Sequence, residues 1–95
     1  MVVSKIPLEI DYDACLWRQG RTFIAFAQNL DIASHGRTRE EALANLGEAV
    51  RGVLKVARED GNLECILEEA GYTKAGDRWT PPQLSHSRAS ASLQE

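Results

Sequence analysis

The spacing of apolar residues changes once along the chain, from every second residue to every third or fourth. Residues 6–14 alternate between apolar and mostly acidic side chains, which predicts a half-buried strand that extends to Trp17. Residues 22–28 predict a second strand, and residues 31–35 a short third one. A turn with Gln19 and Gly20 as its two loop residues is expected to join the first two strands.

That turn decides which residues of the first two strands lie opposite each other. The predicted pairs on the helix-facing side are Leu16–Phe23, Ala14–Ala25 and Tyr12–Ala27. The other face then carries Cys15, Trp17, Ile24 and Phe26. A second face with such large apolar groups needs a cover, and we expect the C-terminal part of the same chain to supply it.

After Gly36, which is expected to adopt a backbone conformation that strains other residues, the period becomes helical. Thr38 and Glu41 have the T-x-x-E spacing of a capping box, in which each side chain accepts a hydrogen bond from the other residue's N–H. The apolar face comprises Ala42, Leu43, Leu46, Ala49, Val50, Val53, Leu54 and Ala57. The solvent side carries Glu41, Glu48, Arg51, Lys55 and Glu59. The helix is expected to continue to about Asp60 and to end at Gly61.

The remaining elements are short. Residues 63–70 predict a second helix that stops at Gly71. Tyr72 and Trp79 flank an Ala-Gly-Asp turn at residues 75–77, which predicts a small hairpin or fourth strand that lays an aromatic ring on the core. The predicted fold class is therefore α+β: a three- to four-stranded antiparallel sheet packed on one long helix, with a second short helix.

Composition indicates one small globular domain, because 43% of the 95 residues are hydrophobic. We expect this domain to span residues 1–80, and residues 81–95, rich in Ser and Ala, to form a disordered tail. The net charge of −3 argues against a free-standing nucleic-acid binder. No apolar run approaches the roughly 18 residues of a membrane span and no signal-peptide pattern occurs, so we expect a cytoplasmic protein.

Candidate chemistry is sparse, and no cofactor or metal is expected. Asp11 and Asp13 are paired carboxylates in a strand, either part of a metal-dependent nuclease site or, as we favour, a solvated polar face. Ser34 and His35 are adjacent, so strand alternation points them to opposite faces, which argues against a nucleophile–base pair. Asp31 is expected to hold a turn by accepting bonds from local backbone N–H groups.

The other reactive or charged side chains also favour structural roles. The two cysteines, Cys15 and Cys65, are expected to be reduced thiols in a strand and a helix. His35 and His86 lack the spacing of metal ligands. The basic residues near strand and helix ends could meet an acidic partner or RNA phosphate, although scattered surface arginines are the simpler interpretation; they are Arg18, Arg21, Arg37 and Arg39.

Residues 23–50 resemble the HicB-like antitoxin family. That family tends to show an aromatic and Ala strand, then L-D-x-x-S-x-G-x-T, then E-E-A-L-x-N-L-x-E-A. The strand and loop positions that match are Phe23, Ala25, Leu30, Asp31, Ser34, Gly36 and Thr38. The helix positions that match are Glu40, Glu41, Ala42, Leu43, Asn45, Leu46, Glu48 and Ala49. The shared residues are of types that usually stabilise a fold rather than form a functional site.

The resemblance covers residues 6–72 and implies both a fold and a function. The implied fold is a partial ribonuclease H-like β-β-β-α-β unit. The implied function is that of a type II antitoxin, which binds a small HicA-type mRNA-cleaving toxin and occludes its active site without chemistry of its own. Many members carry a C-terminal operator-binding module, which the sequence lacks, so direct DNA binding is not expected. The alternatives are a solitary binding protein without a toxin and a ribonuclease H-like nuclease.

The sequence also suggests how partners are bound. The net negative charge of the chain is complementary to a basic, RNA-binding toxin and would speed their encounter. The expected anchors are Trp17, Arg18 and Phe26, because aromatic residues and Arg dominate binding hot spots. Open sheet edges and an apolar outer sheet face also predict a homo-oligomer, a dimer or a tetramer.

Overall fold

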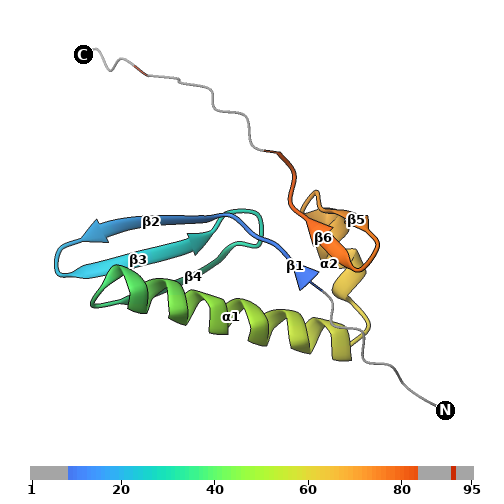
Figure 1. Cartoon of the computed structure of the whole chain (residues 1–95), viewed down its shortest axis with the longest axis horizontal. Coiled ribbons are helices and arrows are strands. Elements are labelled where there is room, and N and C mark those ends of the chain that lie inside the picture. The colour runs from blue at the N-terminus through green and yellow to red at the C-terminus, as the bar shows by residue number, and fades with distance from the viewer. Residues whose placement is uncertain (1–8, 84–90, 92–95) are drawn as a thin grey trace.

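The structure, a computed structural model, describes residues 9–83 and residue 91 of the chain (Figure 1). Its strands are β1 (Glu9–Ile10), β2 (Ala14–Gln19), β3 (Thr22–Ala27), β4 (Ile32–Gly36), β5 (Thr73–Ala75) and β6 (Arg78–Thr80). Its helices are α1 (Arg39–Glu59) and α2 (Leu63–Glu69). The α+β prediction is therefore confirmed, including the long helix and the short one. Most of the predicted tail lies outside the described residues.

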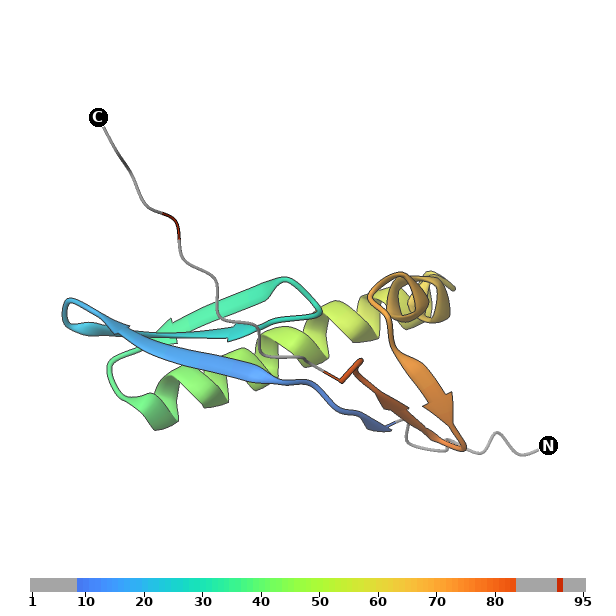
Figure 2. The same cartoon turned by 90° about the horizontal axis from the view of Figure 1, so that it is seen from above.

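The strands form two small sheets that lie along the same long helix. Antiparallel β2, β3 and β4 form one sheet in that order, and the other has the order β1-β6-β5. The first sheet covers the N-terminal half of α1, whereas the second lies beyond the start of β2, near the C-terminus of the helix (Figures 1 and 2). The predicted hairpin after Tyr72 thus exists, but it joins a separate sheet rather than the main one.

The prediction of one strand from residue 6 to Trp17 is wrong, and residues 6–8 lie outside the described residues. The chain pairs first with β6 in parallel, Glu9 opposite Arg78, and then leaves that sheet at Asp11. It pairs again from Ala14 onward, as β2 against β3. Alternation of apolar and polar side chains continues across the gap, so the pattern alone does not reveal that the strand changes its partner.

The predicted hairpin register is also wrong, although the predicted faces are right. Leu16 pairs with Ala25 instead of Phe23, and the two loop residues are Gly20 and Arg21. Gly20 has a φ of 66°, and a glycine at the first loop position of a two-residue hairpin adopts such a conformation without steric cost. The register moves by two residues, which leaves every side chain on its predicted face.

Helix α1 begins as the sequence predicts. The Thr38 Oγ1 accepts a hydrogen bond from the Glu41 N–H at 3.0 Å, and Thr38 is the N-cap. The Glu41 carboxylate, however, accepts from the Arg37 N–H at 2.6 Å rather than from that of Thr38. The helix ends with Asp60 as its C-cap and Gly61 in a left-handed conformation, φ 77°.

The core runs continuously beneath both sheets. Leu46 of α1 and Leu67 of α2 are its largest fully buried side chains. Tyr72 and Trp79 are buried at either side of the β5–β6 turn, as predicted for an aromatic laid on the core. The remaining buried residues are Ala25, Ala27, Ala42, Val50, Leu54, Ala57 and Leu63. Within the described part of the chain, neither helix is long and apolar enough to cross a membrane.

Candidate functional site

The motif that resembles the HicB-like family holds β4 against α1. Asn45 donates through Nδ2 to the backbone carbonyl of His35, 2.9 Å away. Ala42 and Leu46 are fully buried under the sheet. Ser34 lies opposite Ala25, on the face of β4 that meets the helix. These residues therefore build the scaffold.

Gly36 and Asp31 serve this scaffold for reasons other than those predicted. Gly36 lacks a left-handed backbone; instead, a Cβ there would lie 2.5 Å from the Ala42 backbone nitrogen, so only glycine permits this approach. Asp31 has a φ of 59°, and it shapes the turn before β4 through this conformation. Among the described residues, the Asp31 carboxylate accepts no hydrogen bond from a local N–H group.

The outer face of the β2–β3–β4 sheet, on the side away from α1, carries a group of large apolar side chains. Trp17 pairs with Ile24, and Cys15 pairs with Phe26. Trp17 is 44% exposed, and the other three are partly exposed. We call these four residues, Cys15, Trp17, Ile24 and Phe26, the outer sheet face.

The described C-terminal elements do not cover the outer sheet face, contrary to our expectation. The β5–β6 hairpin lies beyond the end of the sheet and pairs with β1 instead (Figure 1). The hairpin goes there because Trp79 and Tyr72 find buried positions against the second half of the core. The outer sheet face is thus left without a cover from residues 9–83.

The three predicted anchors lie in two places. Trp17 and Phe26 both lie on the outer sheet face, in the neighbouring cross-strand pairs Trp17–Ile24 and Cys15–Phe26. Arg18 follows Trp17 in β2, so its side chain leaves the sheet on the opposite side, where its Nε donates to the Gly20 carbonyl at 3.0 Å. Trp17 donates through its indole N–H to Gln19 Oε1 at 3.4 Å. The aromatic pair therefore forms one surface, while Arg18 lies on the opposite side of the sheet, near the hairpin turn.

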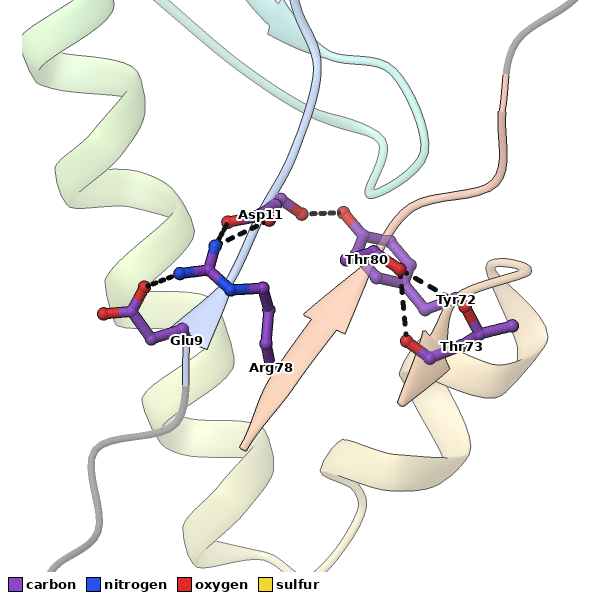
Figure 3. A network of polar contacts seen from close by, with 6 residues as sticks. All are labelled: Glu9, Asp11, Tyr72, Thr73, Arg78 and Thr80. Carbon is purple, nitrogen blue, oxygen red and sulfur yellow. Dashed lines mark hydrogen bonds and ion pairs between the residues drawn. The ribbon is translucent and has the colours of Figure 1, made fainter. Parts of the chain in front are cut away.

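Asp11 belongs to a polar cluster that joins the ends of the described chain (Figure 3). Arg78 donates through Nη1 to both carboxylate oxygens of Asp11, at 2.8 and 2.9 Å, and through Nη2 to Glu9 at 3.0 Å. The hydrogen bond that Arg78 donates to Asp11, with the negative charges of Asp11 and Glu9, raises the pKa of Arg78. Asp11 therefore has a structural partner. In the described part of the chain, no three side chains are grouped to bind a metal ion.

Tyr72 fastens the same cluster to the core. Its hydroxyl donates to the Asp11 backbone carbonyl at 2.6 Å, while its ring is almost fully buried. Burial, followed by the negative charges of Asp13 and Asp11, raises the pKa of Tyr72 to about 12. Thr73 and Thr80 share a hydrogen bond of 3.2 Å across the neighbouring hairpin (Figure 3). The two strand ends are thus held by polar contacts as well as by packing.

A groove lies between the second half of α1 and the link from β1 to β2. Its volume is about 420 Å³. The apolar and neutral lining residues are Ile10, Tyr12, Gly47, Val50, Leu54 and Leu63. Three basic residues, Arg51, Lys55 and Arg58, complete the lining. Arg51 and Lys55 were predicted on the solvent side of the helix, and their spacing of four residues indicates one basic ridge, but no pattern in the sequence reveals the groove.

Comparison with known proteins supplies no relative. No model of a known protein family matches the chain, and no curated protein or solved structure does.

The two cysteines do not form a disulfide. Cys15, on the outer sheet face, accepts a contact from the Gln28 side-chain amide at 2.7 Å, and Cys65 is exposed on α2. The predicted placement of one thiol in a strand and one in a helix is confirmed.

Proposed function

We propose that the chain is a protein-binding module that acts as an antitoxin of the HicB-like kind. The observation that carries this proposal is the outer sheet face, an exposed apolar surface on which Trp17 of the edge strand β2 is the most exposed side chain. Exposed apolar patches with aromatic residues are typical of protein interfaces. The proposed partner is a small basic toxin that cleaves mRNA, and the mechanism is occlusion of its active site.

The preformed strand pairing of the sheet favours binding of a partner. The main-chain hydrogen bonds of β2, β3 and β4 and the cap of α1 position Trp17 before any partner arrives, so little ordering entropy is lost on association. In the described part of the chain, β2 and β4 are the edges of their sheet, and each is able to pair with a strand of the toxin.

The negative net charge of the chain favours a basic partner, because it attracts such a protein over a long range. The chain carries a net charge of −3, which speeds encounter with a basic protein at low salt. The hairpin turn that joins β2 to β3 is itself basic, with Arg18 and Arg21 exposed beside it. An acidic patch on the toxin is therefore expected to meet this turn, while the basic surface of the toxin meets the acidic remainder of the chain.

The test is co-expression with a basic toxin encoded beside this chain, scored by growth rescue and co-purification. The substitution Trp17→Ala should weaken the complex by at least about 2 kcal/mol, roughly 30-fold in Kd, because buried Trp residues are typical hot spots. Ile66→Ala is the matched control, since Ile66 is an exposed apolar residue on α2. Arg18→Glu should weaken binding less, because the Arg18 side chain leaves the sheet on the side opposite to Trp17.

Two results would contradict the proposal. One is failure of the wild-type chain to rescue growth or to co-purify with that toxin. The other is equal weakening by Trp17→Ala and Ile66→Ala, which would show that the outer sheet face is not the contact surface.

The same surface supports a second candidate, self-association of a solitary binding protein. Two outer sheet faces are chemically alike, and stacking them would remove Trp17, Ile24 and Phe26 from water in both copies. In that case Trp17→Ala should convert an oligomer into a monomer in light scattering. A wild-type chain that remains monomeric at high concentration rules out this candidate and leaves the antitoxin proposal in place.

A further inference from the structure

The groove beside α1 combines an apolar floor with a basic wall. Val50 and Leu54, one turn apart, are buried along its floor, and Leu63 of α2 is buried at its far end. Arg51, Lys55 and Arg58 follow at spacings of four and three, so they form one ridge next to that floor.

The second wall comes from a different part of the chain. Ile10 and Tyr12, which link β1 to β2, are partly buried against the core opposite the basic ridge. Gly47 marks the near end, where an added Cβ would lie 3.5 Å from the Tyr12 hydroxyl oxygen. The groove is therefore framed by α1, by α2 and by the link between the two sheets.

The basic residues of the groove lack acidic partners among residues 9–83. The ion pairs of the described chain involve Lys74 and Arg78, and neither lines the groove. No Asp or Glu is among the described lining residues. Three unpaired cations in a chain with a net charge of −3 concentrate positive potential at this place.

We propose that this groove binds a free organic anion that has an apolar body and a carboxylate or phosphate head. The head would be held by the Arg51, Lys55 and Arg58 side chains, since guanidinium groups bind such oxygens through paired hydrogen bonds. The body would lie on Val50, Leu54 and Leu63. The volume of about 420 Å³ falls within the range of small-molecule sites, roughly 300–1,000 Å³.

This site is separate from the surface proposed for the toxin. None of its lining residues belongs to the outer sheet face, and the groove lies on the helix side of the structure, toward the second sheet. Ligand binding and toxin binding are therefore distinguishable, and failure of either leaves the other standing.

Octyl phosphate is a suitable probe, followed by NMR of the full-length protein. Shift changes are expected at the backbone amides of Gly47 and Leu63, at the two ends of the groove. Octanol has the apolar chain without the phosphate group, and inorganic phosphate lacks the chain. Each should bind at least about tenfold more weakly than octyl phosphate. Added NaCl should weaken octyl phosphate binding, because exposed ion pairs are screened.

Two double variants separate the groove from general charge effects. Arg51→Gln with Lys55→Gln should weaken octyl phosphate binding about 5- to 10-fold, as expected for two exposed ion pairs. Arg21→Gln with Arg37→Gln is the matched control, because it removes two exposed cations from the other end of the molecule, and it should leave the affinity unchanged.

Three outcomes would overturn the proposal. They are absence of shift changes at Gly47 and Leu63, equal weakening by the two double variants, and binding to phosphatidylglycerol vesicles in place of soluble octyl phosphate. All four substituted residues are exposed, so a spectrum with wild-type dispersion outside the groove confirms that the fold is retained.

Discussion

The two sheets of this molecule are stabilised by different kinds of contact. The β2–β3–β4 sheet consists of two consecutive hairpins, each strand paired with its neighbour in sequence, on the apolar face of α1. The β1–β6–β5 sheet joins strands from the two ends of the described chain, and Arg78 links Glu9 and Asp11 across 69 and 67 residues. The first sheet depends on burial and on pairing between strands that are neighbours in sequence, whereas the second depends on burial of Tyr72 and Trp79 and on polar contacts between distant residues.

This difference indicates that the first sheet is the better candidate for binding a partner, whereas the charged residues of the second sheet stabilise the fold. The first sheet is paired and packed on its helix side, which leaves its other face available for a partner. The second sheet uses its charged side chains internally, so Asp11 and Arg78 hold the fold rather than a ligand. Four substitutions test this comparison.

Truncation of the two fully buried leucines should have the largest effect. Leu46→Ala and Leu67→Ala should each lower the free energy of unfolding by about 2–5 kcal/mol, through lost burial and a residual cavity. Urea denaturation measures both losses. Hydrogen exchange should show that Leu67→Ala exposes the amides of β5 and β6 first, because Leu67 lies in the helix before them. Equal loss of protection in both sheets would show that they unfold as one unit.

Gly36→Ala should have the next largest effect and should act on the first sheet. The added methyl group meets the backbone of Glu41 and Ala42 below 3 Å, so β4 must move away from α1 at a cost of about 1–3 kcal/mol. Gly52→Ala is the matched control, since nothing lies within 4 Å of its added Cβ. It should stabilise the protein by up to about 1 kcal/mol in the same denaturation experiment. Similar effects of the two variants would contradict the steric explanation.

Tyr72→Phe should have the smallest effect and should act on the second sheet. It removes the hydrogen bond to the Asp11 carbonyl and should cost about 1 kcal/mol at neutral pH. The pKa of Tyr72 is raised from 10.0 to about 12, so the folded state retains this proton more tightly than the unfolded state does. Its contribution is therefore complete below pH 10 and is lost as the pH rises through 12.

The measurement is the difference in unfolding free energy between wild type and Tyr72→Phe across that pH range. The difference should shrink as the pH rises, because the variant has no hydroxyl to titrate. A difference that stays constant would show that the Tyr72 hydroxyl does not titrate in the predicted window.

The elements that could be predicted from the sequence are those determined by residues within one short segment. The cap at Thr38 and the apolar spacing through α1 lie within one segment, so the bounds of the helix agree to within a residue. The faces of β2 and β3 were predicted because alternation sets them, even though the register was not. The register depended on which residue of the turn adopts a positive φ, and Gly20 takes the first loop position instead of the second.

The second sheet and the groove depend on contacts between distant residues, which a local pattern does not encode. Nothing near Glu9 or Asp11 in the sequence indicates that Arg78 is their partner. The composition of the outer sheet face was predicted, but its lack of a described cover was not, since this follows from where the β5–β6 hairpin packs. The groove forms only when Ile10 and Tyr12 approach α1 from outside the helix.

The pairing of β1 with β6 also imposes an order on folding. During synthesis the β2–β3–β4 hairpins and α1 emerge while Glu9 and Ile10 still lack a partner, because Arg78 and Trp79 are translated last among the described strands. Closing so long a loop costs more chain entropy than forming either hairpin, so it is expected to be a late kinetic step. A ribosome-bound nascent chain would thus display the outer sheet face before its second sheet is complete.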